Sequence, residues 1–320
     1  MPTPLLERKK AIVVCLETEY GVAPAIETGT LILATELSIT PYQGNTVERT
    51  RIRPEFGGYA QINTGPNTQL QVTTPWSGSG AAPEVGVSVT PPAWGLLARA
   101  CQMQEVEDLD AGEVTYTRTS SEGDSLTIYY LHDGQQQCVT GVRGTITGSA
   151  ATGALPTLAF TFIGLYQRPT TVAPITLSYG SQADEIPVNF QNTTEFTLLG
   201  HEAIGQSFSF DLANTVTYRN LVNYEGVHIT DSAPTGQAAF QAPRIADFDV
   251  FQKIESHQVV TTGAVAFSHG TVPGNIVGAR GPKVQMASMT TQDSDGITHV
   301  QSDLRWLPVE GDDELVLFAA

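Results

Sequence analysis

The chain has 320 residues, of which 41% are hydrophobic and 15% are charged, and its formal net charge at pH 7 is −17. A chain of this length can bury a large core without disulfides or metals, and this composition is too apolar for a disordered protein. The acidic balance argues against a protein that holds nucleic acid by its phosphates, because such binding requires clustered Lys and Arg side chains.

Cysteine spacing and apolar run length exclude further classes. Cys15, Cys101 and Cys138 are odd in number and far apart, so they form neither a disulfide framework nor a zinc motif. No apolar run approaches the roughly 20 residues of a membrane-spanning helix, so we expect no membrane partner. The apolar run at residues 11–16 is shorter than a signal-peptide core and predicts a strand.

Most of the chain is predicted to be β-strand. Apolar and polar residues alternate with period two in several segments, which is typical of antiparallel sheets with one face on a core. These segments are residues 36–40, 126–130, 158–162 and 207–212. Turn signals rich in Asp, Gly and Ser occur between strands, at residues 121–124, 132–134 and 293–296.

Helical signals are few. Residues 92–101 place Trp94, Leu97, Ala98 and Cys101 on one stripe at helical spacing, with Pro92 in the first turn. Residues 244–255 form a second candidate helix, with apolar residues three apart, although a short strand at residues 248–251 is an alternative. We therefore expect one short helix in each half.

The order of these signals repeats along the chain. An Asn-Thr-Val tripeptide follows an alternating strand at residues 45–47 and again at residues 214–216, and each is followed by a candidate helix. This order predicts a duplicated domain at residues 1–170 and 171–320, joined by the Pro-containing segment 167–174. The predicted fold is mainly β: two tandem antiparallel β-sandwich or barrel-like domains, each with one short flanking α-helix.

The first half carries a surplus of residues that predicts an insertion loop at about 54–92. This segment is rich in Gly and Pro and contains three aromatic residues, Phe56, Tyr59 and Trp76. Long loops in compact domains are usually functional, and aromatic side chains are enriched at interfaces. We expect these three residues to contact another subunit, with a self-packed surface loop as the alternative.

Two basic segments are further candidate contacts. Arg49, Arg51 and Arg53 alternate, so a single strand would place them on one face, where carboxylates of a neighbouring chain or ring could bind them. The alternative is a solvated edge that discourages aggregation. The N-terminal arm, residues 1–10, contains the basic run Arg8, Lys9 and Lys10 and is a second candidate for a contact between rings.

Motifs for chemistry are missing from the sequence. No Gly-rich segment has phosphate-binding or nucleophile-elbow spacing, and the six histidines are dispersed. The acidic turn at residues 293–296 lacks the later ligands of a calcium loop. We therefore expect no catalytic residues, no cofactor and no metal site, and we do not expect an enzyme.

Several segments, taken in order, resemble the tail tube proteins, or major tail proteins, of bacteriophages with long, flexible, non-contractile tails. The likeness is carried mainly by the first half, and in the second half by residues 234–236 and 312–315. The first-half segments are residues 17–25 (ETEYGVAPA), 78–83, 92–101, 129–134, 140–144 and 160–166.

The resemblance implies a structural virion protein that assembles in the host bacterial cytoplasm. It implies rings of six tube domains that stack into a hollow tube: three chains per ring if the duplication holds, otherwise six. DNA would pass through an acidic lumen without specific binding, and an acidic outer surface for solubility is the alternative use of the charge. Implied partners are the tape-measure, tail-tip and tail-terminator proteins. A different function remains open, that of a tandem β-sandwich adhesin or receptor-binding protein of a virion or cell surface.

Overall fold

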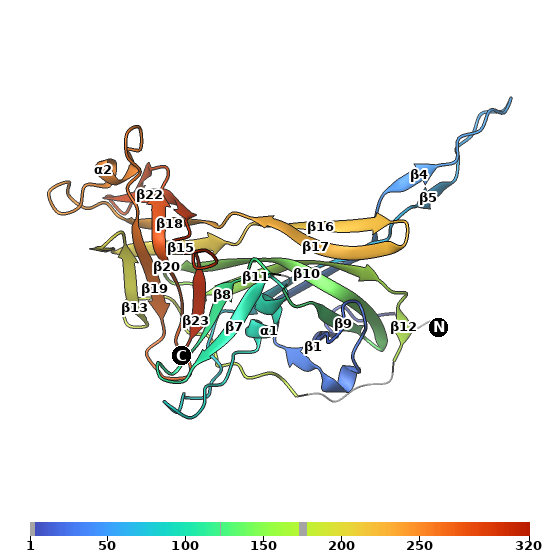
Figure 1. The fold of residues 1–320 in the computed structure, drawn as a ribbon, viewed down its shortest axis with the longest axis horizontal. Helices are drawn as coiled ribbons and strands as arrows, with labels where there is room; N and C mark the ends of the chain where they lie inside the picture. The colour runs from blue at the N-terminus through green and yellow to red at the C-terminus, as the bar shows by residue number, and fades with distance from the viewer. Residues whose placement is uncertain (1–3, 122, 173–177) are drawn as a thin grey trace.

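The computed structural model describes residues 4–121, 123–172 and 178–320. This part of the chain contains twenty-three β-strands, two short α-helices and one 3-10 helix (Figure 1). Every pairing between these strands is antiparallel, and the expectation of a mainly β protein is confirmed. The antiparallel sheets enclose a shared core, which is compatible with the expected β-sandwich.

In the first half, seven strands pair side by side in the order β2-β1-β9-β10-β11-β6-β3. Their bounds are β1 Lys10–Leu16, β2 Thr30–Ile32, β3 Glu36–Gln43, β6 Asn67–Pro75, β9 Leu126–His132, β10 Gln135–Ala151 and β11 Thr157–Tyr166. The apolar run of β1 is buried on both faces, because Ile12 and Val14 face the main core while Val13 and Cys15 join Tyr129 in a small second cluster.

In the second half, seven strands pair in the order β14-β13-β19-β20-β22-β18-β15. Their bounds are β13 Thr193–Leu198, β14 His201–Glu202, β15 Gly205–Asp211, β18 Thr235–Gln241, β19 Gly263–His269, β20 Val277–Met286 and β22 Ile297–Trp306. The chain fills the seven strand positions of this sheet in the same order as it fills those of the first sheet.

In both halves, a hairpin and a short helix occur at matching places in the order of the strands. A hairpin leaves after the third strand: β4 Thr46–Glu48 with β5 Gln61–Asn63 in the first half, and β16 Asn214–Leu221 with β17 Tyr224–Ser232 in the second. A short helix follows the next sheet strand, α1 Trp94–Arg99 and α2 Val250–Ile254. The repeated order of signals in the sequence is thus matched by a repeated order of paired strands.

The two sheets are joined to each other at two places. The last residues of β10, 147–151, pair with residues 207–211 of β15. A hairpin of the first half, β7 Met103–Asp108 and β8 Glu113–Arg118, pairs through β8 with the C-terminal strand β23 Val316–Ala319. One hydrophobic cluster draws side chains from both halves, so the halves share a core.

The local predictions succeed where short-range rules decide the structure. The helix expected at residues 92–101 is α1, and Trp94, Leu97 and Ala98 are buried as the stripe requires. Two-residue turns connect β9 to β10 and β21 (Thr290–Ser294) to β22, with positive φ angles at Asp133 and Asp295 and at the glycine after each. The expected turn at 121–124 and the expected linker at 167–174 lie partly outside the described residues.

The second helix is shorter than expected, and the prediction of residues 244–255 is wrong at its N-terminal end. Asp249 has an extended backbone, and its carboxylate accepts a hydrogen bond from the N–H of Gln252 at 3.0 Å. This N-cap starts the helix at Val250, because a capping carboxylate satisfies an N–H that has no partner within the helix.

Candidate assembly surfaces

The hairpin β4–β5 projects away from the sheets and ends in an irregular tip, residues 49–60 (Figure 1). The tip has its own internal contacts. The hydroxyl of Tyr59 donates to the carbonyl of Arg51 at 2.6 Å, and the guanidinium of Arg53 donates to the carbonyl of Gly58 at 2.6 Å. The same guanidinium lies 4.6 Å from the centre of the Tyr59 ring. These contacts hold the tip in a defined shape although it touches no other element.

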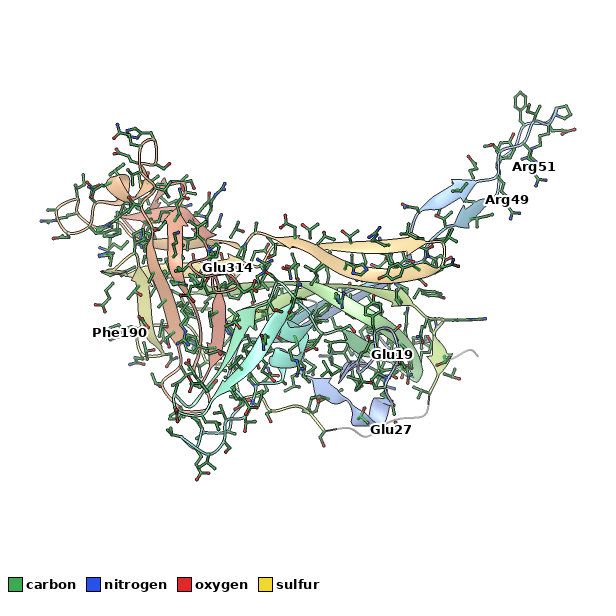
Figure 2. The ribbon with its side chains drawn as sticks, in the orientation of Figure 1. Glu19, Glu27, Arg49, Arg51, Phe190 and Glu314 are labelled. Carbon is green, nitrogen blue, oxygen red and sulfur yellow. The ribbon has the colours of Figure 1, made fainter. Side chains whose placement is uncertain are left out.

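The tip presents basic and apolar groups to solvent. Ile52 and Phe56 are fully exposed, and Arg49 and Arg51 lie on the hairpin well away from the sheets (Figure 2). In the part of the chain that the structure describes, no carboxylate lies within ion-pair distance of Arg49, Arg51 or Arg53. The tip is therefore free to bind groups outside the chain.

The expectation that Arg49, Arg51 and Arg53 share one face of a strand is wrong. Strand β4 ends at Glu48, and only the N–H of Arg49 continues the ladder, to the carbonyl of Ala60 at 3.0 Å. Residues 49–60 form an irregular tip, within which Pro54 has no N–H to donate to a strand ladder.

Two of the three basic side chains in the N-terminal segment form ion pairs within the chain. The ammonium of Lys9 lies 2.9 Å from the carboxylate of Asp133, which also accepts the N–H of Leu6, and these bonds lower the pKa of Asp133. The ammonium of Lys10 contacts the carboxylate of Glu7. Arg8 is exposed and, within the described residues, has no ion pair. Residues 1–3 of the expected arm lie outside the described residues.

The expectation that Trp76 contacts another subunit is wrong, and so is the expectation of a loop throughout residues 54–92. Strand β6 occupies the middle of this segment and pairs with both β11 and β3. Trp76, which follows it, is 1% exposed, with its ring centre 5.5 Å from that of Phe210 and 5.9 Å from that of Phe267. Trp76 is a core residue between the halves and cannot contact another subunit.

The segment after Trp76 also joins the two halves. The N–H of Gly78 donates to the side chain of Asn275 at 3.1 Å, and the N–H of Gly80 donates to the carbonyl of Gly274 at 2.8 Å. A Cβ on Gly78 would lie 2.2 Å from the carbonyl oxygen of Gly274. The glycine at position 78 is therefore required by close packing of two backbones rather than by mobility.

The second long hairpin, β16–β17, lies against the first half of the chain, over β10 and β11 (Figure 1). The buried guanidinium of Arg143 donates to the carbonyl of Val227 at 3.2 Å and lies 5.0 Å from the centre of the Tyr20 ring. The hydroxyl of Tyr20 accepts the N–H of Val227 at 2.6 Å and donates to the carbonyl of Gly141 at 3.3 Å. Burial raises the pKa of Tyr20.

The sequence analysis did not predict the contact between Tyr20 and Val227, although Tyr20 lies in residues 17–25, one of the segments that carry the family resemblance. Glu17, three residues before Tyr20, is buried, and its carboxylate accepts four hydrogen bonds of 2.6–2.8 Å. The donors are the N–H groups of Gly21 and Gly141 and the hydroxyls of Ser125 and Thr127. These bonds hold the Glu-Thr-Glu-Tyr-Gly segment in place, and Tyr20 of this segment contacts the second hairpin.

Within residues 4–121, 123–172 and 178–320, no three His, Cys, Asp or Glu side chains gather closely enough to hold a metal ion. The same ranges contain no helix with the length and apolar character needed to cross a membrane.

Comparison with known proteins identifies one matching family. The model of one family, described as phage tail tube protein, matches residues 7–307. No curated protein matches the sequence. Because the family match covers nearly the whole chain, including both sheets and both hairpins, the chain belongs to the phage tail tube protein family.

Proposed function

We propose that this chain assembles with copies of itself into stacked rings, and that these rings form the hollow tube of a phage tail. The family is structural, which supports a virion protein rather than an enzyme. The tube would carry DNA to the host through its bore. The net charge of −17 would prevent the wall of the bore from binding the phosphates of the DNA. Tape-measure, tail-tip and tail-terminator proteins would be its other partners, with assembly in the host cytoplasm.

The observation that carries this proposal is the projecting hairpin. Its tip holds two fully exposed apolar side chains, Ile52 and Phe56, on a segment that contacts none of the sheets. Exposed apolar groups cost free energy in a soluble monomer, and a cluster of them marks an interaction site. Arg49, Arg51, Arg53 and Tyr59 would add polar contacts to the acidic surface of a neighbouring copy in the same ring or the next.

The repeated strand order supports two tube domains per chain, at residues 1–170 and 171–320. Rings of six tube domains would then need three chains. Native mass spectrometry of isolated rings measures this directly, because three and six chains differ twofold in mass.

The experiment that tests the function compares two matched surface variants. In the double variant Ile52→Ser/Phe56→Ser, the tip loses its apolar groups without any loss of core packing. The control is Val85→Ser/Val87→Ser, which changes two exposed valines on a loop of the first half in the same way. Negative-stain microscopy of concentrated protein should show tubes for the wild type and the control, but not for the tip variant. Wild-type protein that stays monomeric, or a tip variant that forms normal tubes, would contradict the proposal.

A further inference from the structure

The projecting hairpin β4–β5 joins its sheet through a short pivot, residues 44–45 and 64–66. The β3–β6 ladder ends before the pivot, and the β4–β5 ladder begins after it. Between the two ladders the N–H of Thr64 donates to the carbonyl of Asn45 at 2.8 Å. The regular pairing of strands is therefore interrupted where the hairpin leaves the sheet.

Two glycines allow close approaches at the pivot. Gly44 has a φ of +150°, and a Cβ there would lie 2.2 Å from the carbonyl oxygen of Gly65. A Cβ on Gly65 would lie 3.3 Å from the Cβ of Asn220 and 3.3 Å from the ring of Tyr218. Both of these residues belong to β16, so the pivot of the first half packs directly against the long hairpin of the second half (Figure 1).

The hydroxyl of Tyr218 is also held at the pivot. It contacts the carbonyl oxygen of Pro66 at 3.3 Å and donates to the carboxylate of Glu225 at 2.5 Å. The side-chain amide of Asn220 donates to the same hydroxyl at 3.1 Å. These bonds connect side chains of β16 and β17, so the ring of Tyr218 is held in one position against the pivot.

The β16–β17 hairpin is itself fixed to the first half beside this contact. Tyr218 lies opposite Val227 in the ladder, and Val227 is the residue whose backbone is bound by Tyr20 and Arg143. Contacts therefore run without a break from the first sheet, through Val227 and Tyr218, to the pivot. A hairpin held in this way resists displacement of the pivot toward it.

The pivot is not packed on every side. A groove of about 360 Å³ lies between the pivot and the β16–β17 hairpin, and its lining includes Asn45, Thr64, Arg219 and Leu221. This space leaves the pivot room to move wherever no side chain supports it. The support comes from the contacts of Tyr218 and Asn220 rather than from a filled core.

We propose that the end of the β16–β17 hairpin sets the direction in which the β4–β5 hairpin projects, with Tyr218 as the positioning residue. The tip lies far from the pivot (Figure 1), so a small rotation at the pivot moves Ile52 and Phe56 away from the place where a neighbouring copy would bind them. The role in assembly rests on the proposed function, whereas the direction of the hairpin is a property of the single chain. A chain presents its tip correctly only after both of its halves have folded.

Spin labels measure the direction of the hairpin in monomers. Gly58→Cys places one label on the tip, where a side chain meets open space, and Gln71→Cys places the other at an exposed position of β6. Because the tip is held by its own contacts, the distance distribution from pulsed electron paramagnetic resonance reports motion at the pivot. The chain without added cysteines, in which Cys15 and Cys101 are buried, gives the background.

The labelled protein is then compared with variants at the contact. Tyr218→Ala should broaden or shift the distance distribution, and Tyr218→Phe, which keeps the ring against Gly65, should restore it. Gly65→Val places a larger side chain in the same contact from the pivot and should also shift it. The control is Tyr224→Ala, which removes a ring from the opposite face of the same hairpin, where it stacks on His228, and should change nothing. An unchanged distribution in both Tyr218→Ala and Gly65→Val would overturn the inference and leave the proposed function intact.

Unlabelled protein tests the consequence for assembly. Tyr218→Ala should form fewer tubes than the wild type at the same concentration, while Tyr218→Phe and Tyr224→Ala should form as many. Tyr218 is only partly buried, so we expect the alanine variant to fold, and circular dichroism checks this. A changed distribution together with normal tubes would overturn the role of Tyr218 in assembly. Failure of the wild type to assemble overturns the proposed function, and the measurement in monomers then still decides whether Tyr218 sets the direction of the hairpin.

Discussion

The hydroxyl of Tyr20 accepts a hydrogen bond from the N–H of Val227 at 2.6 Å, although 207 residues separate the two in the chain. Val227 is fully buried, and its N–H points out of the β16–β17 ladder toward the first half. This bond, together with the one from Arg143 to the carbonyl of Val227, holds a long hairpin of the second half flat against the first.

Replacing Tyr20 with Phe tests this attachment. The ring stays, but the buried N–H of Val227 loses its acceptor, which costs about 1–3 kcal/mol for an unsatisfied buried donor. We expect the free energy of unfolding, measured in urea, to fall by that amount. Tyr42→Phe is the control, because Tyr42 is 53% exposed, and it should change stability by less than about 0.5 kcal/mol. Equal effects in the two variants would show that the hydroxyl of Tyr20 does not hold the hairpin.

The parts of the fold that follow from local rules could be predicted from the sequence. Alternation located strands such as β11 and β15, and the Asp-Gly turns located two hairpins, because side-chain period and turn geometry are decided by neighbouring residues. Strand β6 was missed because its surroundings are rich in Gly and Pro, while what makes it a strand is pairing with β11, some 90 residues later.

The environment of Trp76 could not be predicted for the same reason, and a substitution can test its place in the core. Its neighbours in sequence suggest a surface loop, but its contacts, Phe210 and Phe267, come from the other half. Trp76→Ala should destabilise the monomer by about 3–5 kcal/mol, as expected for removal of a buried aromatic side chain. Phe56→Ala, at a fully exposed position, should change monomer stability by less than about 0.5 kcal/mol. Thermal unfolding followed by circular dichroism separates the two outcomes, and a small loss at Trp76 would contradict its place in the core.

The candidate contact surfaces are harder to predict than the core, for a physical reason. A core residue is recognised by apolar neighbours within the same chain, whereas an interface residue is completed by another copy. The sequence therefore singled out Arg51 and Phe56 by residue type, but it could not show that they lie on a projecting tip. Nor could it show that Lys9, of the same residue class, is bound to Asp133 within the chain.

The acidic turn before the last strand should give a pH-dependent stability. The carboxylate of Asp313 accepts the N–H groups of Val309, Glu310 and Gly311, and these bonds, the first above all, lower its pKa. A carboxyl whose pKa is lower in the folded state than its unfolded value of about 3.9 adds stability above that value. This stability is lost as the pH falls through the lowered pKa.

The Asp313→Asn variant should therefore have a lower Tm than the wild type at pH 7, and the difference should shrink as the pH falls below about 4. Asp110→Asn, in the exposed turn between β7 and β8, serves as the control and should change Tm little at pH 7. Calorimetry over a pH series measures both variants. A difference for Asp313→Asn that stays constant down to low pH would mean that the charge of this carboxylate does not stabilise the turn.

Charge reversal at Arg51 tests whether the basic tip binds carboxylates of a neighbouring copy. The contact of Arg51 with Tyr59 uses the backbone carbonyl, so Arg51→Glu preserves it while it reverses the exposed charge. If the tip faces an acidic surface, the variant should assemble less than the wild type, and the deficit should narrow as salt rises, because screening at 1 M salt limits such repulsion to about 3 Å. Arg244→Glu reverses an exposed arginine in the second half and should leave assembly unchanged. Light scattering at several salt concentrations gives the comparison. A deficit that does not change with salt would indicate that the tip binds through its apolar side chains, Ile52 and Phe56, rather than through charge.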